Sequence, residues 1–413
     1  MLYQAYEMLY KASAPYRAAA LWGQFLWRSR LNPMPDSFIS SYMAAYCDVV
    51  EVLTRRYDKP QWRLSSPEIE EGKKATLRIK TVYEKAFCHL LHFKRSHSIL
   101  KTRNDPKVLV VAPMAGHFAT LLRGTVEALM VDHDVYITDW LDARHVSIFD
   151  GPFDLEDYIA YIMEFIAFLG PDIHIVAVCQ PGPAVLAAVS LMAEDDHPAK
   201  PASMTFMGSP IDTRKSPTVP NDLATQRPIE WFEQNVIHTV PAPYHGMMRR
   251  VYPGFLQLTG FMSMNLERHY KAHMQLFENL VVNDGDSVEK HREFYDEYLA
   301  VMDLTADFYL QTIKTVFQDC ALPKGEMMWR GRKVNPAAIS KTALMTVEGK
   351  KDDISGVGQT RAAHTICKNI PKEKKEIYLH PNVGHYGIFN GSKWRNEIKP
   401  ELAAFFRKNP KAV

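Results

Sequence analysis

A cysteine at the end of an apolar run is the residue in this sequence best placed for covalent chemistry. Cys179 directly follows the run Ile173-His-Ile-Val-Ala-Val178, and Pro181-Gly182 then open a helix-like stretch. A sharp strand-to-helix turn lifts one side chain above a sheet, and the start of the helix favours a thiolate and an oxyanion. The small residue usual two positions after such a nucleophile is replaced by Pro181. Taken alone, Cys179 fits a buried structural cysteine equally well.

Two later residues favour the catalytic interpretation. Asp352 follows the apolar run 343–347, and His385 follows the run 376–379. Nucleophile, acid and histidine, each after a strand, occur in the chain order of α/β-hydrolases, which cleave or transfer acyl groups. The acid is ambiguous, because the adjacent Asp353 and the earlier Asp212 also lie in loops that follow strands.

Such chemistry also requires two backbone N–H groups that stabilise an oxyanion. We expect one from Gln180, directly after the nucleophile, and the other from Met114 or Ala115 in the loop after the run 108–112. In the same loop His117 is a candidate substrate contact, although an ordinary polar loop histidine is as good an interpretation.

Alternating apolar runs and helix-like stretches predict the scaffold for these residues. Short continuous apolar runs near 108, 135, 173 and 204 alternate with helix-like stretches, which is typical of a parallel sheet covered on both faces. The expected core helices are 119–131, 154–169, 183–193, 358–367 and 394–406. The predicted fold is a doubly wound, mostly parallel α/β-hydrolase sheet with a helical N-terminal extension and a helical cap insertion. The expected divisions are 1–74 for the extension, 75–214 and 339–413 for the core, and 215–338 for the cap.

The two helical additions are rich in aromatic residues and methionine. In the extension, apolar residues recur at helical spacing from Leu2 to Leu9 and from Tyr42 to Val49, which predicts helices packed on the core. An alternative is a sticky surface for a partner or an apolar substrate. From the cap we select four further candidate substrate contacts: Tyr244, Met248, Tyr252 and Phe255.

Composition excludes several other classes. The 413 residues carry 49 basic and 47 acidic side chains, a balance that gives no reason to expect nucleic acid. The five cysteines are scattered and odd in number, so we expect reduced thiols, no zinc site and a cytoplasmic protein. No stretch has the length and apolarity of a transmembrane helix, and we expect no export signal.

Several motifs together resemble one family, the intracellular polyhydroxyalkanoate (poly-3-hydroxybutyrate) depolymerases, over essentially the whole chain. The motifs are Met1-Leu-Tyr-Gln, Ala112-Pro-Met-Ala-Gly-His117, Tyr136-Ile-Thr-Asp-Trp140, Val178-Cys-Gln-Pro181, Gly208-Ser-Pro-Ile-Asp212, Lys215-Ser-Pro217, Val251-Tyr-Pro-Gly-Phe255, Leu344-Met-Thr-Val-Glu-Gly349, Asp352-Asp-Ile-Ser-Gly356 and Gly384-His-Tyr-Gly-Ile-Phe389. The resemblance implies a Cys179–Asp352–His385 triad that acts on stored polyester granules in the cytoplasm. It implies no cofactor, and a homo-oligomer is left open.

Three alternatives to simple hydrolysis are kept. A cysteine acyl-enzyme is a thioester, so coenzyme A could accept the acyl group in place of water. A related polyester synthase or acyl transferase is a second alternative, although in those enzymes the acid is typically followed by His, where this chain has Asp353. The third is a granule-coating or scaffolding protein without activity, which the complete set of triad residues disfavours.

Overall fold

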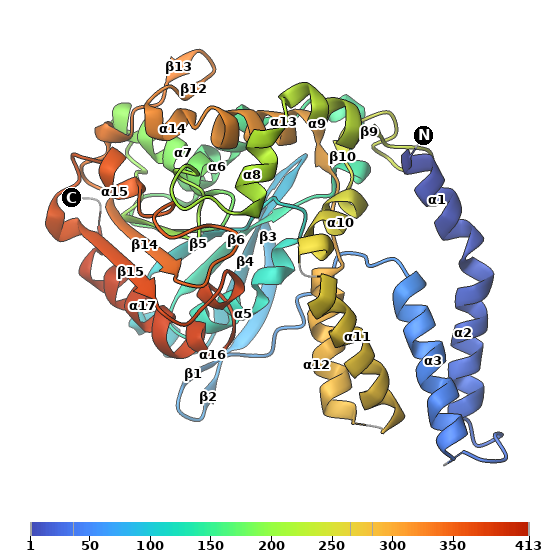
Figure 1. The fold of residues 1–413 in the computed structure, drawn as a ribbon. Helices are drawn as coiled ribbons and strands as arrows, with labels where there is room; N and C mark the ends of the chain where they lie inside the picture. The colour runs from blue at the N-terminus through green and yellow to red at the C-terminus, as the bar shows by residue number, and fades with distance from the viewer. Residues whose placement is uncertain (1, 36, 265, 283, 412–413) are drawn as a thin grey trace.

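A computed structural model describes residues 2–35, 37–264, 266–282 and 284–411, so Met1 of the first motif lies outside it. Its centre is an eight-stranded sheet (Figure 1). The strands of this sheet are β3 (Thr76–Lys85), β4 (Cys88–Ser96), β5 (Lys107–Val111), β6 (Asp134–Trp140), β7 (His174–Val178), β8 (Ser203–Met207), β14 (Ala343–Gly349) and β15 (Lys375–His380).

The order of the strands identifies the fold. Across the sheet they run β15-β14-β8-β7-β5-β6-β4-β3, and the pairs from β15 to β6 are parallel. β4 is antiparallel both to β6 and to β3, with which it forms a hairpin. A mostly parallel sheet with an antiparallel hairpin at one edge, and a strand order that reverses at β5, is the α/β-hydrolase fold, which confirms the predicted class.

The central strands are continuous apolar runs because helices cover both faces of the sheet. Every residue of β7, β8 and β14 is buried. One layer contains α6 (Leu155–Leu169) and α7 (Gly182–Glu194), and the other contains α5 (Arg123–Leu129) and α17 (Lys399–Lys408) (Figure 1). The short helices α4 (Leu100–Arg103), α15 (Ala363–Ile366) and α16 (Gly391–Lys393) lie in the connections.

Three core helices differ from the sequence prediction. The stretch 119–131 begins as a 3₁₀ turn, Ala119–Leu122, before α5, and 394–406 begins as a wider π-type turn, Trp394–Ile398. Of the helix expected over 358–367 only α15 forms. The buried carboxylate of Glu348 accepts hydrogen bonds from the backbone N–H groups of Gly358 and Arg361, and these bonds hold the segment as a loop.

The insertion after β8 is mainly helical, as expected, but it also contains strands that were not predicted. β9 (His238–Thr239), β10 (Arg250–Tyr252) and β11 (Leu304–Thr305) form a three-stranded antiparallel sheet. Two or three residues are too few to show the alternation that signals a strand. The helices are α8 (Val219–Gln226), α9 (Ile229–Val236), α10 (Gly254–Met264), α11 (Leu266–Val281), α12 (Gly285–Tyr298), α13 (Ala306–Thr312) and α14 (Ala321–Lys324).

Two small hairpins lie outside the main sheet. One pairs β1 (Glu68–Glu70) with β2 (Lys73–Lys74), and the other pairs β12 (Met328–Trp329) with β13 (Arg332–Lys333). A π-type turn, Ile313–Gln318, links α13 to the segment before α14, and 3₁₀ turns such as Tyr386–Ile388 complete the loops.

The N-terminal extension forms three helices, α1 (Leu2–Ala12), α2 (Ala14–Arg28) and α3 (Phe38–Thr54). α2 and α3 pack on each other and project from the body beside α11, and we call them the helical arm (Figure 1). The prediction that the apolar stripe of α1 packs on the core is wrong: Leu2 is 47% and Leu9 is 74% exposed. Within the described ranges, no helix combines the length and apolarity needed to cross a bilayer.

Polar contacts, not that apolar stripe, attach α1 to the body. The Tyr3 hydroxyl donates to the buried Asp303 carboxylate at 2.6 Å, and the other oxygen of Asp303 accepts the Gly254 N–H at 2.8 Å. Arg56 donates to Glu7 at 2.8 Å. Tyr3 and Glu7 therefore face the body, and Tyr6 beside them stacks on Phe255, whereas Leu2 and Leu9 of the apolar stripe stay in solvent.

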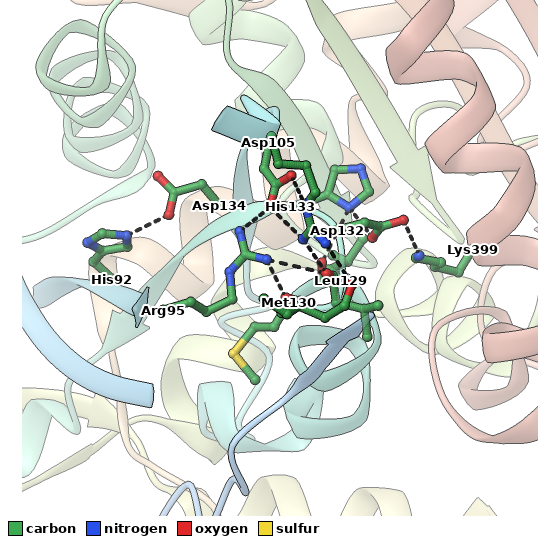
Figure 2. Close-up of polar contacts among 12 residues, drawn as sticks. His92, Arg95, Asp105, Leu129, Met130, Asp132, His133, Asp134 and Lys399 are labelled. Atoms are coloured by element: carbon green, nitrogen blue, oxygen red, sulfur yellow. Dashed lines mark hydrogen bonds and ion pairs between the residues drawn. The ribbon is translucent and has the colours of Figure 1, made fainter. Parts of the chain in front are cut away.

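A polar cluster ties the sheet to its helices at the amino ends of the parallel strands (Figure 2). Arg95 on β4 donates to Asp105 at 2.6 Å, and Lys399 on α17 donates to Asp132 at 2.6 Å. Burial would raise the pKa of Asp132, but His133 and Lys399 outweigh it and lower the pKa to about 2. The reactive end of an open α/β sheet is the opposite one, so we interpret this cluster as structural.

The start of α6 provides a test of local stability. Asp154 caps this helix: its side chain accepts the Asp157 N–H, and the Asp157 carboxylate accepts the Asp154 N–H. We expect Asp154→Ala to lower the free energy of unfolding by about 1 kcal/mol, measured by urea denaturation. Asp154→Asn keeps an acceptor and should retain most of that stability. Equal losses in the two variants would contradict a capping role.

Candidate active site

The backbone of Cys179 adopts a conformation that is rare for a residue with a side chain. Its φ is +66°, in the left-handed region, and its N–H donates to the Met207 carbonyl at 2.8 Å. Such strain persists only where surrounding contacts hold it, and it is the conformation of the strand-to-helix turn that presents a nucleophile. Cys179 is only half-buried, whereas Cys47, Cys88, Cys320 and Cys367 are buried.

The helix after Cys179 approaches the neighbouring loop very closely. A Cβ atom on Gly182 would lie 2.4 Å from the Cβ of Ser209, so only glycine fits at the first position of α7. Pro181 precedes it with a φ of −66°, which suits the entry to a helix. The small residue that the turn requires therefore occurs one position later than in the usual pattern, which explains why Pro181 is tolerated.

The structure brings His385 and Asp352 into direct contact. His385 Nδ1 lies 2.8 Å from Asp352 Oδ2, and the Asp352 side chain is fully buried. The other carboxylate oxygen accepts the backbone N–H groups of Ile354 at 2.9 Å and Ser355 at 2.8 Å. These bonds fix the carboxylate and leave Nε2 as the ring nitrogen available to Cys179.

Cys179 and His385 interact in turn. Burial of the ring disfavours its charged form, but the negative charge of Cys179, with hydrogen bonds to Asp352 and Cys179, outweighs burial and raises the pKa of His385 well above its ordinary 6.5. A ring that stays protonated beside a thiolate can later return a proton to a leaving group.

The other two candidate acids are engaged or placed differently. Asp212 binds Arg214 through both oxygens, at 2.7 and 2.9 Å. Burial would raise the pKa of Asp212, but hydrogen bonds from Arg214 outweigh it and lower the pKa. Asp353 is exposed, and the contact to His385 comes from Asp352.

The candidate oxyanion donors are not equivalent. The Met114 N–H donates to the Gln180 side-chain oxygen at 3.1 Å. In the described part of the chain, neither the Gln180 N–H nor the Ala115 N–H has a hydrogen-bond acceptor. Gln180 thus links the loop after β5 to the turn after β7, and the N–H groups of Gln180 and Ala115 are left for a ligand. Their catalytic role stays a prediction.

His117, in the same loop after β5, makes a contact within the protein. It is buried, one ring nitrogen lies 3.0 Å from the Tyr298 carbonyl, and burial lowers its pKa to about 4. His117 also forms a β-bridge with Val301. The neutral ring therefore supports the loop, and contact with substrate stays a prediction.

The four cap candidates do not form one cluster. Tyr244 bonds to Arg56 and Glu7 at the attachment of α1, and Phe255 stacks on Tyr6 at a centroid distance of 4.2 Å. Tyr252 packs against Tyr309, and Met248 is exposed. Their contact with substrate stays a prediction.

Two residues important to the site were not singled out from the sequence. Gly208, at the end of β8, has a φ of +56°, and a Cβ there would lie 3.1 Å from His385 Cε1 and 3.2 Å from Asp352 Oδ2. Glu348 holds the loop that carries Asp352 through the N–H groups of Gly358 and Arg361. The motif Gly208-Ser-Pro contained the first signal, since a glycine directly after a buried strand often marks a close approach.

A cavity of about 680 Å³ lies apart from the three residues, between the arm and the cap helices α10 and α11, and its wall does not include Cys179, Asp352 or His385. Among the described residues, no group of three or more His, Cys, Asp or Glu side chains is arranged to hold a metal ion.

The chain is similar to several solved hydrolase structures at low sequence identity. A soluble variant of monoglyceride lipase from Saccharomyces cerevisiae is 10% identical, with a TM-score of 0.47, over 85% of this chain and 99% of that one. The 2-hydroxy-6-oxo-6-phenylhexa-2,4-dienoate hydrolase of Rhodococcus sp. strain RHA1 is 13% identical, with a TM-score of 0.44, over 80% and 100%.

Sequence comparisons indicate which α/β-hydrolases this chain is similar to. Residues 208–410, just under half of the chain, match the family model described as PHB de-polymerase C-terminus. The poly(3-hydroxyalkanoate) polymerase subunit PhaC of Haloferax mediterranei is 22% identical over 352 residues, which span 82% of this chain but less than two thirds, 65%, of that protein. The chain is thus an α/β-hydrolase related to polyhydroxyalkanoate depolymerases and polymerases.

Replacement of Gly208 tests the close packing behind the triad residues. In Gly208→Ala the new methyl group should displace His385 or Asp352, and we expect kcat/KM to fall about tenfold or more. Gly170→Ala is the matched control, because Gly170 also has a positive φ, +84°, but a Cβ there meets nothing within 4 Å. An equal loss in the two variants would show that backbone strain alone is responsible.

Titration of His385 tests the interaction with Cys179. In the wild type the ring should stay protonated well above pH 6.5, whereas Cys179→Ala removes a negative neighbour and should lower the pKa of His385. The measurement is the NMR shift of the imidazole Cε1–H against pH, with the resonance assigned by its loss in His385→Asn. Identical titration curves for wild type and Cys179→Ala would refute the ion pair.

Proposed function

We propose that the protein is a polyhydroxyalkanoate depolymerase that cleaves the ester bonds of stored poly-3-hydroxybutyrate through a cysteine acyl-enzyme. One observation carries the proposal: Cys179 sits on a strained strand-to-helix turn and interacts with His385, which is bonded to a buried Asp352. Nucleophile, base and orienting carboxylate are the parts of acyl transfer by covalent catalysis.

The nature of the substrate is supported by the relatives. The matched family model carries the name of a depolymerase of this polyester, and the relative from Haloferax mediterranei is named as a polymerase of the same class. The model covers the segment that contains Asp352 and His385, but it begins after Cys179. The proposed site of action is the polyester granule inside the cell.

The first half of the reaction uses the charged pair. The Cys179 thiolate attacks an ester carbonyl of the polymer, and the negative oxygen is stabilised by the N–H groups of Gln180 and Ala115. An alkoxide is a poorer leaving group than the thiolate, so the intermediate proceeds only if a proton is supplied. Protonated His385 donates it to the departing oxygen as the C–O bond breaks, which leaves a thioester on Cys179.

The second half frees the enzyme. Neutral His385 takes a proton from water, the oxygen attacks the thioester carbonyl, and the C–S bond breaks to release a hydroxyacid and restore the thiolate. A coenzyme A thiolate can attack the same carbonyl in thioester exchange and release a hydroxyacyl thioester. Coenzyme A is therefore the alternative acceptor, and the proposed reaction needs no cofactor.

Polymer synthesis is the second candidate function, because the relative from Haloferax mediterranei is named as a polymerase subunit. A polymerase uses the same nucleophile to form the acyl-enzyme and then transfers the acyl group to the hydroxyl of a growing polymer chain. The family pattern for the synthases disfavours it here, since Asp353 follows Asp352. Incubation with 3-hydroxybutyryl-coenzyme A separates the two functions, because a polymerase releases free coenzyme A and insoluble polyester.

Exchange of the nucleophile tests the proposed chemistry. We expect Cys179→Ala to abolish release of 3-hydroxyacids from amorphous granules, and Cys179→Ser to lower the rate about 100-fold or more, which is about 2.7 kcal/mol of transition-state stabilisation. The reason is that a serine hydroxyl lacks the preformed charge of a thiolate. The products, with and without coenzyme A, are identified by mass spectrometry.

Iodoacetamide labelling supplies the control for reactivity. Cys179 should be modified faster than the buried thiols, and the matched variant Cys47→Ala should keep full activity. A Cys179→Ala protein that still degrades granules would exclude cysteine catalysis. A Cys179→Ser protein with unchanged rate and products would show that sulfur does not determine the chemistry.

A further inference from the structure

The outer side of α2 is apolar and open to solvent. Four large side chains on it are more than half exposed: Leu21 by 53%, Trp22 by 66%, Phe25 by 59% and Leu26 by 52%. At 3.6 residues per turn they cover an arc of about 140° of the helix surface. The opposite side packs on α3, and the polar residues Arg17, Gln24 and Arg28 lie on a stripe between the two, so α2 has two apolar sides where a surface helix usually has one.

The end of the arm continues this surface in other directions. Leu31 and Met34, in the turn between α2 and α3, are 82% and 52% exposed, and Phe38 at the start of α3 is 71% exposed. In Figure 1 this turn is the part of the arm farthest from the sheet. We call the exposed apolar side chains of this region the docking face: Leu21, Trp22, Phe25, Leu26, Leu31, Met34 and Phe38.

Of the ionisable groups next to the docking face, Arg17 and Arg28 bond to other parts of the arm and of α1, whereas Arg30 is exposed. Arg17 donates to the Tyr10 and Thr54 carbonyls at 2.9 and 3.0 Å, and Arg28 pairs with the buried Asp48. From Ala18 to Trp27 the sequence contains no ionisable residue. The docking face itself therefore offers apolar contact and the indole N–H donor of Trp22, with the cations Arg28 and Arg30 at its edge.

We propose that the docking face inserts into the surface of solid aliphatic polyester and holds the enzyme there, an inference that rests on the proposed function for the identity of the polymer. Monomeric proteins rarely leave so large an apolar surface in water. An aliphatic polyester is uncharged, largely apolar and able only to accept hydrogen bonds. Its chemistry complements a face that has no charge and donates through Trp22.

The shape of the docking face favours a deformable polymer over a second copy of the chain. A symmetric dimer buries one self-complementary patch on each copy. The exposed side chains here point outward along α2 and also surround the end of the arm, so one rigid partner face would leave part of them in water. A surface that yields around the inserted arm covers them all.

The arm is also connected to the active site. α3 packs against α11, and the cavity of about 680 Å³ between them is walled on its inner side by Leu299 and Val301. The next residue in this segment, Met302, donates its N–H to Gly116 in the oxyanion loop at 2.7 Å. Polymer held by the arm would thus lie beside the cap segment that supports this loop.

The experiment separates attachment to the particle from catalysis. The variant Leu21→Ser/Phe25→Ser removes two exposed side chains, and Phe149→Ser is the matched control, since Phe149 is 95% exposed on the body of the protein. We expect the arm variant to bind amorphous poly(3-hydroxybutyrate) particles at least tenfold more weakly in co-sedimentation. Hydrolysis of dissolved p-nitrophenyl butyrate should be unchanged in both variants, which shows that the fold is intact.

Other outcomes have distinct meanings. Particle binding by the arm variant equal to wild type would overturn the proposal, as would a wild-type oligomer, measured by light scattering, that the variant dissociates. Stronger wild-type sedimentation with phosphatidylglycerol vesicles than with polymer would overturn it in favour of a membrane. If the wild type binds particles through the arm but releases no hydroxyacid, the proposed function fails while the docking face stands.

Discussion

The left-handed turn at Cys179 is the constraint on which the rest of the site depends. A residue with a side chain occupies this conformation only if its neighbours hold it, and here the Cys179 N–H is tied to the end of β8 while Gly182 packs against Ser209 with no room for a Cβ. The turn therefore needs the full central sheet in place. The same turn directs the thiol towards His385, and among the described residues it leaves the Gln180 N–H without an acceptor.

The second requirement is a buried carboxylate, Asp352, with both oxygens hydrogen-bonded. Each oxygen of Asp352 has its own partners, two backbone N–H groups on one side and His385 on the other. The carboxylate of Glu348, which is also buried, accepts the N–H groups of Gly358 and Arg361 in the following segment of the loop. Burial of a charge is costly unless it is paired, so these two carboxylates order a loop that has little regular structure. Asp212 cannot substitute for Asp352 because Arg214 already binds it.

The molecule combines a densely packed body, which holds the triad residues, with an arm that exposes apolar side chains. The body buries His385 beside Cys179 and Asp352, whose interactions raise the pKa of the ring although burial alone would lower it. The arm exposes apolar side chains such as Trp22 and Leu31 that a compact enzyme would bury. An enzyme with an insoluble substrate must bind a surface and must also bind a single ester bond. In our proposals the arm binds the surface, and the turn at Cys179 acts on the ester bond.

Local pattern was sufficient for the order of strands and helices in the core, because buried parallel strands are continuous apolar runs, but not for the short strands β9–β11 of the insertion. It also placed Cys179, Asp352 and His385 at strand ends. It could not separate Asp352 from Asp212 or Asp353, since only the packed structure decides which carboxylate meets His385 and which is taken by Arg214. The pattern also predicted the wrong buried face for α1, because helical spacing shows that an apolar stripe exists but not which residues cover it. Buried polar contacts between residues 300 positions apart, Tyr3 and Asp303, determined that orientation, and such contacts leave no local signal in a sequence.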